Sequence, residues 1–87
     1  MCILACYYER SESVLRVYKG PLSKRITVLL PNNPKTPGKL CYRRFGLYSP
    51  GMTVAEYYLA CEQIGEKPRR YKLDIEWDLD HRFIRLD

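Results

Sequence analysis

The strongest constraint in this sequence is a short motif that fixes where one helix begins. Thr53 and Glu56 have the spacing of a capping box, in which each residue's side chain accepts a hydrogen bond from the other's backbone amide. Behind this motif, apolar residues recur along one helix face: Val54, Tyr57, Tyr58, Cys61 and Ile64. Gly65 follows at the position where glycine commonly ends a helix. We therefore predict a helix over residues 54–64.

A loop rich in proline, asparagine and glycine, residues 31–38, separates this helical half from a β-rich half, residues 1–30. Apolar runs rich in Tyr, Val, Ile and Leu predict strands at residues 2–8, 14–18 and 26–30, the first two forming an N-terminal β-hairpin. The loop is too short for an interdomain linker, and 87 residues suffice for one domain. We predict a single domain over residues 1–87.

The helical half, residues 39–87, contains one ambiguous segment. A first helix is expected over residues 39–48, where Gly46 lowers the helix propensity, and a last strand at 83–86. Residues 70–79 alternate apolar and charged side chains, which is the period of a strand, although their aspartates are poor strand formers. One alternative is therefore an antiparallel sheet with two helices, in which residues 70–79 form a strand.

From residue 33 onward the sequence resembles a pattern in short proteins encoded by phages and prophages. The matching residues are Asn33-Pro34-Lys35, Pro37-Gly38, Arg44-Phe45, Tyr48, Gly51-Met52-Thr53-Val54, Glu56, Asp74-Ile75, Trp77-Asp78, His81, Phe83-Ile84 and Leu86. The resembling proteins have glycine at the position of Arg82. The resemblance implies a helix-turn-helix arrangement ending in a strand, a truncated winged-helix layout. It favours a helix at residues 69–79, and residues 26–30 are then expected to pair with 83–86.

On this basis the predicted fold class is α+β, a small winged-helix-like domain with an N-terminal β-hairpin. The chain is basic, with 15 Lys and Arg against 10 Asp and Glu, a net charge of +5. The excess lies in residues 1–50, which carry nine basic and two acidic residues, whereas residues 51–87 carry six and eight. Such asymmetry favours a surface for an anionic partner, either nucleic acid or an acidic protein surface.

Basic residues interleaved with tyrosines are the candidate binding residues. They are Lys24, Arg25, Lys39, Arg43, Arg44, Lys67, Arg69, Arg70 and Lys72. Lysine and arginine neutralise phosphates, and tyrosine can stack on bases. The first functional hypothesis is a phage- or mobile-element-encoded DNA-binding regulator of winged-helix type. The second is a phage inhibitor of a host nucleic-acid-handling defence complex, similar in action to an anti-CRISPR protein and working by protein–protein binding.

An acidic run, formed by Asp74, Glu76, Asp78 and Asp80, follows these basic residues. Its alternate spacing does not fit a calcium loop, and we expect a solvated acidic stripe or a protein-binding surface that imitates nucleic acid. His81 is the only histidine and has no nucleophile at a catalytic spacing. The sequence therefore predicts a protein that is not an enzyme and that needs no cofactor or metal.

The four cysteines, at positions 2, 6, 41 and 61, have a poor spacing for zinc and are expected to act as small apolar residues. The sequence has neither a recognisable secretory signal nor an apolar run of transmembrane length. We therefore expect a protein of the host cell cytoplasm with reduced thiols.

Overall fold

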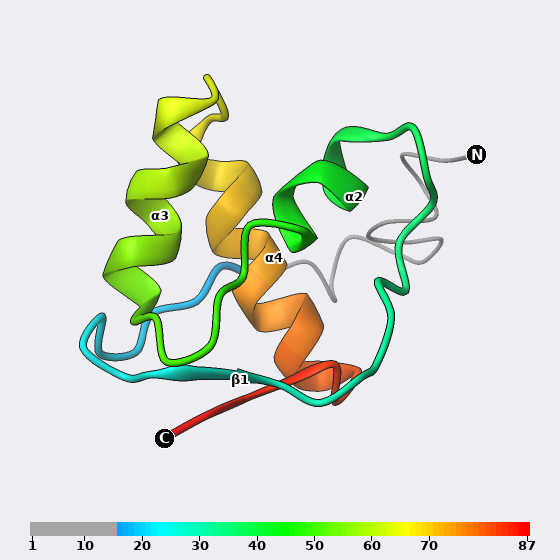
Figure 1. Cartoon of the computed structure of the whole chain (residues 1–87). Helices are drawn as coiled ribbons and strands as arrows, with labels where there is room; N and C mark the ends of the chain where they lie inside the picture. Colours follow the sequence, from blue (N-terminus) through cyan, green and yellow to red (C-terminus); the bar gives the residue numbers. More distant parts are fainter. Residues whose placement is uncertain (1–15) are drawn as a thin grey trace.

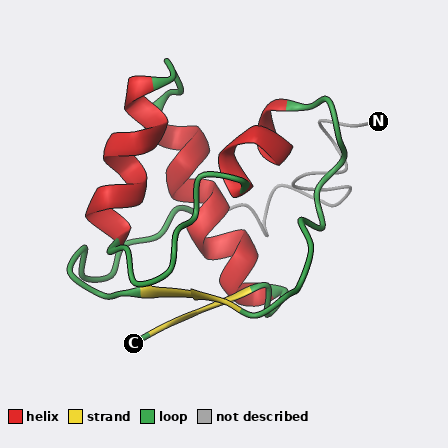
Figure 2. Cartoon of the chain, viewed as in Figure 1, coloured by secondary structure: helices red, strands yellow, loops and turns green. Residues whose placement is uncertain are grey.

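The computed structural model describes residues 16–87, which form a small α+β domain (Figure 1). In chain order this part contains the strand β1, three helices and the strand β2. Their bounds are β1 Ile26–Val28, α2 Leu40–Phe45, α3 Val54–Gln63, α4 Pro68–Asp80 and β2 Ile84–Leu86. The two strands lie together at one end of the molecule, and the helices lie to one side of them (Figure 2).

The sheet joins the two ends of the described chain. Strands β1 and β2 are antiparallel, with Ile26 opposite Leu86 and Val28 opposite Ile84. The predicted pairing of residues 26–30 with 83–86 is therefore confirmed, with both strands shortened to three residues. Ile26 and Ile84 are both buried and connect the sheet to the helical core.

Helix α3 begins as the sequence predicts. The Thr53 hydroxyl accepts from the Glu56 amide at 3.1 Å, and the Glu56 carboxylate accepts from the Thr53 amide at 2.8 Å. At the other end, Gly65 has a φ of 87°, which only glycine adopts readily, and the Glu66 amide donates to the Cys61 carbonyl at 3.0 Å. The capping box and the glycine stop are both confirmed.

Helix α4 shows that the strand alternative for residues 70–79 is wrong. The alternating apolar residues contact different neighbours: Tyr71 and Ile75 pack in the cluster shared with α3, whereas Leu73 packs with Cys41 of α2. A helix covered on several sides needs apolar residues on more than one face, so its sequence loses the simple period of an amphipathic helix. Pro68 occupies the first turn, where its missing amide hydrogen is not required.

Two other predictions need correction. Helix α2 ends at Phe45 rather than at residue 48, with Gly46 as its C-cap. The predicted N-terminal hairpin falls mainly on residues 1–15, which lie outside the described part, and residues 16–18 are not in a strand. Instead, this segment runs beside α4, where the Tyr18 amide donates to the Lys72 carbonyl at 3.0 Å.

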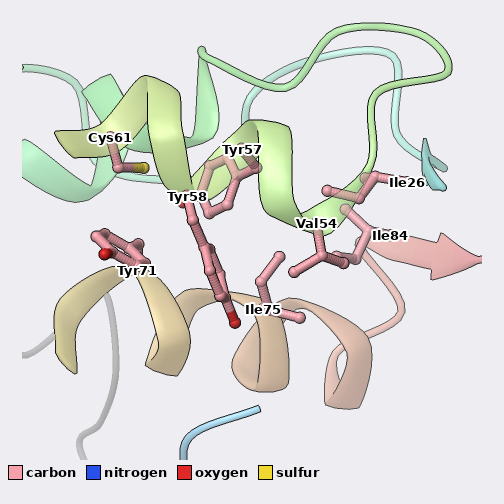
Figure 3. Close-up of a cluster of buried hydrophobic side chains, with 8 residues drawn as sticks. All are labelled: Ile26, Val54, Tyr57, Tyr58, Cys61, Tyr71, Ile75 and Ile84. Carbon is pink, nitrogen blue, oxygen red and sulfur yellow. The ribbon is translucent and has the colours of Figure 1, made fainter. Parts of the chain in front are cut away.

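The main core lies between α3, α4 and the sheet (Figure 3). Its buried members are Ile26, Val54, Tyr57, Tyr58, Cys61, Tyr71, Ile75 and Ile84. Tyrosine rings supply much of its volume, with the centroids of the Tyr58 and Tyr71 rings 4.6 Å apart.

Arg82, where the resembling phage proteins have glycine, has a φ of 61° in the turn between α4 and β2. None of the helices in residues 16–87 has the length and apolarity needed to span a membrane.

Candidate anion-binding surface and buried ion pairs

Half of the acidic run points into the protein. Asp74 is 2% exposed and faces Arg44, whose Nε and Nη2 both donate to its carboxylate, the latter at 3.2 Å. The Tyr57 hydroxyl donates to the same carboxylate at 2.8 Å. The remaining Nη1 group of Arg44 donates to Glu66 at 3.0 Å. Asp74 is thus neutralised and hydrogen-bonded within the domain, as a buried carboxylate requires.

Asp78, one helical turn further along α4, has a second set of internal partners. It is 1% exposed, its carboxylate lies 2.7 Å from Lys35 Nζ, and it accepts from the Tyr48 hydroxyl at 2.7 Å. Burial raises the pKa of Asp78 to about 6, although Lys35 and Tyr48 act in the opposite direction. The expectation of a solvated acidic stripe is therefore wrong for Asp74 and Asp78; of the other two residues of the run, Glu76 is half-buried and Asp80 is exposed.

The tyrosines that bind these carboxylates also contact one another. The rings of Tyr48 and Tyr57 are stacked with their centroids 4.5 Å apart. Burial raises the pKa of both hydroxyls well above the ordinary value, and the adjacent aspartates raise them further. Both tyrosines therefore stay protonated and serve as hydrogen-bond donors to Asp74 and Asp78. This cluster accounts for a structural role and shows no nucleophile facing solvent.

Arg44 therefore does not belong to an exposed binding surface. The sequence groups it with Arg43, but the two adjacent side chains on α2 point in different directions. Arg43 is exposed, whereas Arg44 is 2% exposed and bound to Asp74 and Glu66. The sequence does not indicate that Arg44 is the buried member of the pair, because its acidic partners Glu66 and Asp74 lie 22 and 30 positions away.

Helix α4 begins with an exposed basic turn. Lys67 is the N-cap and its side chain makes no capping hydrogen bond, and the first turn contains no acidic residue. Arg69 and Arg70 are exposed, and Lys72 is half-buried. Positive side chains at this position oppose the helix dipole, which favours negative charge at a helix N-terminus. The dipole and the cations together give this end of α4 a strong attraction for an anion.

Two further basic residues belong to the segment that packs along α4. Arg16 and Lys19, from the segment that runs along α4, line a shallow depression of about 420 Å³ together with Arg69, Val17 and Glu76. The sequence shows Lys19 next to a tyrosine but gives no signal for Arg16, because the docking of residues 16–18 on α4 is a tertiary contact. The Arg16 guanidinium lies 3.5 Å from Asp80 at the other end of α4, so we call Lys19, Lys67, Arg69, Arg70 and Lys72 the α4 basic end.

The other predicted basic residues lie elsewhere. Lys24 and Arg25 are exposed at the opposite end of α3, where the Lys24 carbonyl accepts from the Val54 amide at 3.0 Å. A ten-residue helix is about 15 Å long, so these two residues do not join the α4 basic end. Lys39 and Arg43 are exposed on α2. The nine candidate residues therefore do not form one continuous patch.

The described cysteines and acidic residues do not form a metal centre. Within residues 16–87, no three His, Cys, Asp or Glu side chains gather in a metal-binding arrangement. Cys61 is a buried free thiol, and burial raises its pKa to about 12. Cys41 is disulfide-bonded, which differs from the expectation that every thiol is reduced.

Comparison of the chain with protein-family models, curated proteins and solved structures finds no match.

Proposed function

We propose that the protein binds nucleic acid as a small DNA-binding regulator of winged-helix type, encoded by a phage or mobile element. The observation that carries this proposal is the exposed basic first turn of α4. A helix start without a side-chain cap or an acidic residue forgoes about 1 kcal/mol of stability. Binding of a phosphate anion supplies the negative charge that this turn lacks.

The burial of two acidic residues, Asp74 and Asp78, supports the proposal. Residues 16–87 contain fourteen basic and eight acidic residues. The buried groups Lys35, Arg44, Asp74 and Asp78 neutralise one another inside the domain. The remaining side chains comprise twelve cations and six carboxylates, so the described part keeps its positive charge at the surface. The acidic run in the sequence therefore does not present four carboxylates to a phosphate backbone.

The arrangement of the helices favours contacts with the DNA backbone. Helices α3 and α4 are joined by a short turn containing Gly65, and β2 follows α4 to pair with β1, an order compatible with a truncated winged helix. The sides of α4 are covered by α3, by α2 and by residues 16–18. Within residues 16–87, the exposed side chains of Lys67 and Arg69 at the start of α4 are left to approach DNA, so phosphate contacts are expected to dominate.

A gel-shift at low salt with random duplex DNA tests the proposal. Wild-type protein should shift the DNA at micromolar concentration, because a DNA-binding domain binds non-specific sites in this range. Arg69→Ala should weaken the shift, and Arg69→Ala/Arg70→Ala should weaken it further. Arg85→Ala is the matched control, since Arg85 is exposed on β2 and pairs with Asp87. No shift by wild type, or equal weakening by Arg85→Ala, would contradict the proposal.

The covering of α4 also supports a second candidate. A helix that cannot lie along a groove is poorly placed to read a DNA sequence, yet its basic end can meet an acidic protein surface. We therefore retain the inhibitor of a host nucleic-acid-handling complex as the alternative. Failure to shift DNA, together with retention by such a complex that Arg69→Glu abolishes, would favour it.

A further inference from the structure

Strand β1 has one edge that β2 does not use. The Arg25 and Leu29 amides donate to the carbonyls of Asp87 and Phe83, at 3.1 and 2.9 Å. In an antiparallel pair, alternate residues direct their backbone groups to opposite edges of the strand. The amide and carbonyl groups of Ile26 and Val28 therefore face away from β2. The Ile26 amide donates to the Met52 carbonyl at 2.7 Å. At Val28, no strand within residues 16–87 pairs with this edge of β1.

An apolar groove lies beside this edge. The loop between α2 and α3 touches the start of β1 through a single bridge, Arg25 with Thr53, and then turns away towards α2 (Figure 1). Between β1 and this loop is a groove of about 460 Å³. Its main apolar lining comes from Ile26, Val28, Leu30, Phe45, Tyr48 and Pro50. None of the residues that line it is charged.

A cation stands at one end of the groove. Gly51 lines the groove, and its carbonyl accepts from Arg25 Nη1 at 2.6 Å. Arg25 is exposed and forms no ion pair within residues 16–87, so the other donors of its guanidinium face solvent. A guanidinium fixed in this way presents a site for a carboxylate.

We propose that this groove binds an extended peptide segment of a protein partner, which adds to the edge of β1 that β2 does not use. The Val28 amide and carbonyl pair with the peptide backbone, an apolar side chain of the peptide enters the groove, and a peptide carboxylate binds Arg25. Edge-strand addition draws its affinity from backbone hydrogen bonds and its specificity from such pockets. Nucleic acid is a poor occupant, because no cation lines the groove itself. The site is separate from the α4 basic end and does not depend on DNA binding.

The test is a titration of ¹⁵N-labelled protein, observed by its amide resonances, with four acetylated hexapeptides. Each alternates threonine with one apolar residue type, Val, Ile, Leu or Phe, and ends in a free carboxylate. At least one peptide should shift the Val28 and Gly51 amides saturably at millimolar concentration. The same peptide with a carboxamide end should bind several-fold more weakly, because the partner of Arg25 is removed.

Two variants locate the site. Val28→Pro removes the edge amide that β2 does not use and should abolish the peptide-induced shifts, since proline is tolerated on strand edges. Gly46→Leu should also abolish them by narrowing the groove, and its backbone is compatible with a side chain because φ is −66°. Leu29→Ala is the control: Leu29 is exposed and does not line the groove, so its variant should bind like wild type.

Three results would overturn the proposal. The first is that none of the four peptides shifts the Val28 amide. The second is that the shifts persist in both Val28→Pro and Gly46→Leu. The third is that the Val28 amide moves on dilution without peptide, or on addition of duplex DNA, because the occupant is then a second copy of the chain or a nucleic acid.

Discussion

Helices α3 and α4 begin in opposite ways. Helix α3 has a complete capping box, with Thr53 as the cap and Glu56 as the acidic residue of its first turn. Helix α4 has Lys67 at its cap without a side-chain hydrogen bond, and it places arginines where α3 has an acid. The first arrangement satisfies free amides and complements the helix dipole, whereas the second does neither. The start of α3 contributes to stability, whereas the start of α4 exposes positive charge and is the surface proposed to bind an anion.

Helix α4 is held in place further along its length. Asp74 and Asp78 are buried one turn apart and bind Arg44 and Lys35. Leu73 and Ile75 are buried on either side of Asp74. A helix anchored by its middle depends little on the capping of its first turn, which explains how the domain tolerates an uncapped basic start.

The largest effect is expected from breaking the internal ion pair of α4. Asp74→Ala removes the carboxylate that binds Nε and Nη2 of the buried Arg44 guanidinium, and it removes the acceptor of the Tyr57 hydroxyl. The free energy of unfolding should fall by about 3–5 kcal/mol, the usual cost of removing one partner of a buried pair. Chemical denaturation measures this change.

The control is Asp80→Ala, which removes an exposed carboxylate of the same helix whose contact with Arg16 is 3.5 Å long. Its effect should stay within about 0.5 kcal/mol of wild type. Equal effects of the two substitutions would mean that α4 is not anchored by Asp74.

The pH dependence of stability should report Asp78. Because burial raises its pKa from 3.8 to about 6, the folded protein binds a proton at a higher pH than the unfolded chain does. The contribution of Asp78 to stability is therefore gained as pH falls from about 6 towards 3.8, and it is lost as pH rises through about 6. Between a pH well below 3.8 and a pH well above 6, the contribution of Asp78 to the free energy of unfolding changes by about 3 kcal/mol.

Asp78→Asn removes this titration and retains the size of the side chain. Unfolding free energies of wild type and variant, measured between pH 4 and 7, should differ increasingly in favour of wild type as the pH is lowered. Parallel pH profiles would contradict a raised pKa for Asp78.

Removing the cap of α3 should have a smaller effect. Thr53→Ala abolishes the side-chain acceptor of the Glu56 amide and should lower the free energy of unfolding by about 1 kcal/mol. Thr53→Ser keeps the hydroxyl and should restore most of the loss. A denaturation midpoint equal to that of wild type in Thr53→Ala would show that the capping box contributes nothing.

The smallest effect, of opposite sign, is expected at the start of α4. Lys67→Asp supplies the missing side-chain acceptor and an acidic group near the helix N-terminus. The free energy of unfolding should rise by about 0.5–1 kcal/mol. Lys39→Asp is the matched control. Lys39 is the N-cap residue of α2 and, like Lys67, makes no capping hydrogen bond with its side chain, but α2 has only six residues. A loss of stability in Lys67→Asp would mean that the basic turn is not a cost to the fold.

The two helices also differ in how far the sequence predicts them. The signals for α3 are local: a cap, a periodic apolar face and a glycine stop within thirteen residues, 53–65. The pattern of α4 misled because Asp74 and Asp78 look like a polar face, although they are buried by partners distant in the sequence. The signals for a helix there were the poor strand propensity of the aspartates and the resemblance to phage proteins.

The same difference applies to the candidate binding residues. Arg69 and Arg70 are exposed at a helix start, a position that the sequence indicates through Pro68. Whether Arg43 or Arg44 points outward depends on where Asp74 lies after folding, 30 positions from Arg44. Contacts of this range are formed by tertiary packing and leave no local trace in the sequence.

The most direct test of the account is the salt dependence of duplex DNA binding by wild type and Lys67→Asp. Fluorescence anisotropy of labelled DNA gives the affinity at each salt concentration. Because each phosphate contact contributes a slope of about −0.9 in a plot of log affinity against log salt, the variant should bind more weakly and with a slope shallower by about one contact or more. A variant that is more stable than wild type yet binds DNA with the same affinity and slope would contradict the assignment of the α4 basic end as the DNA-binding surface.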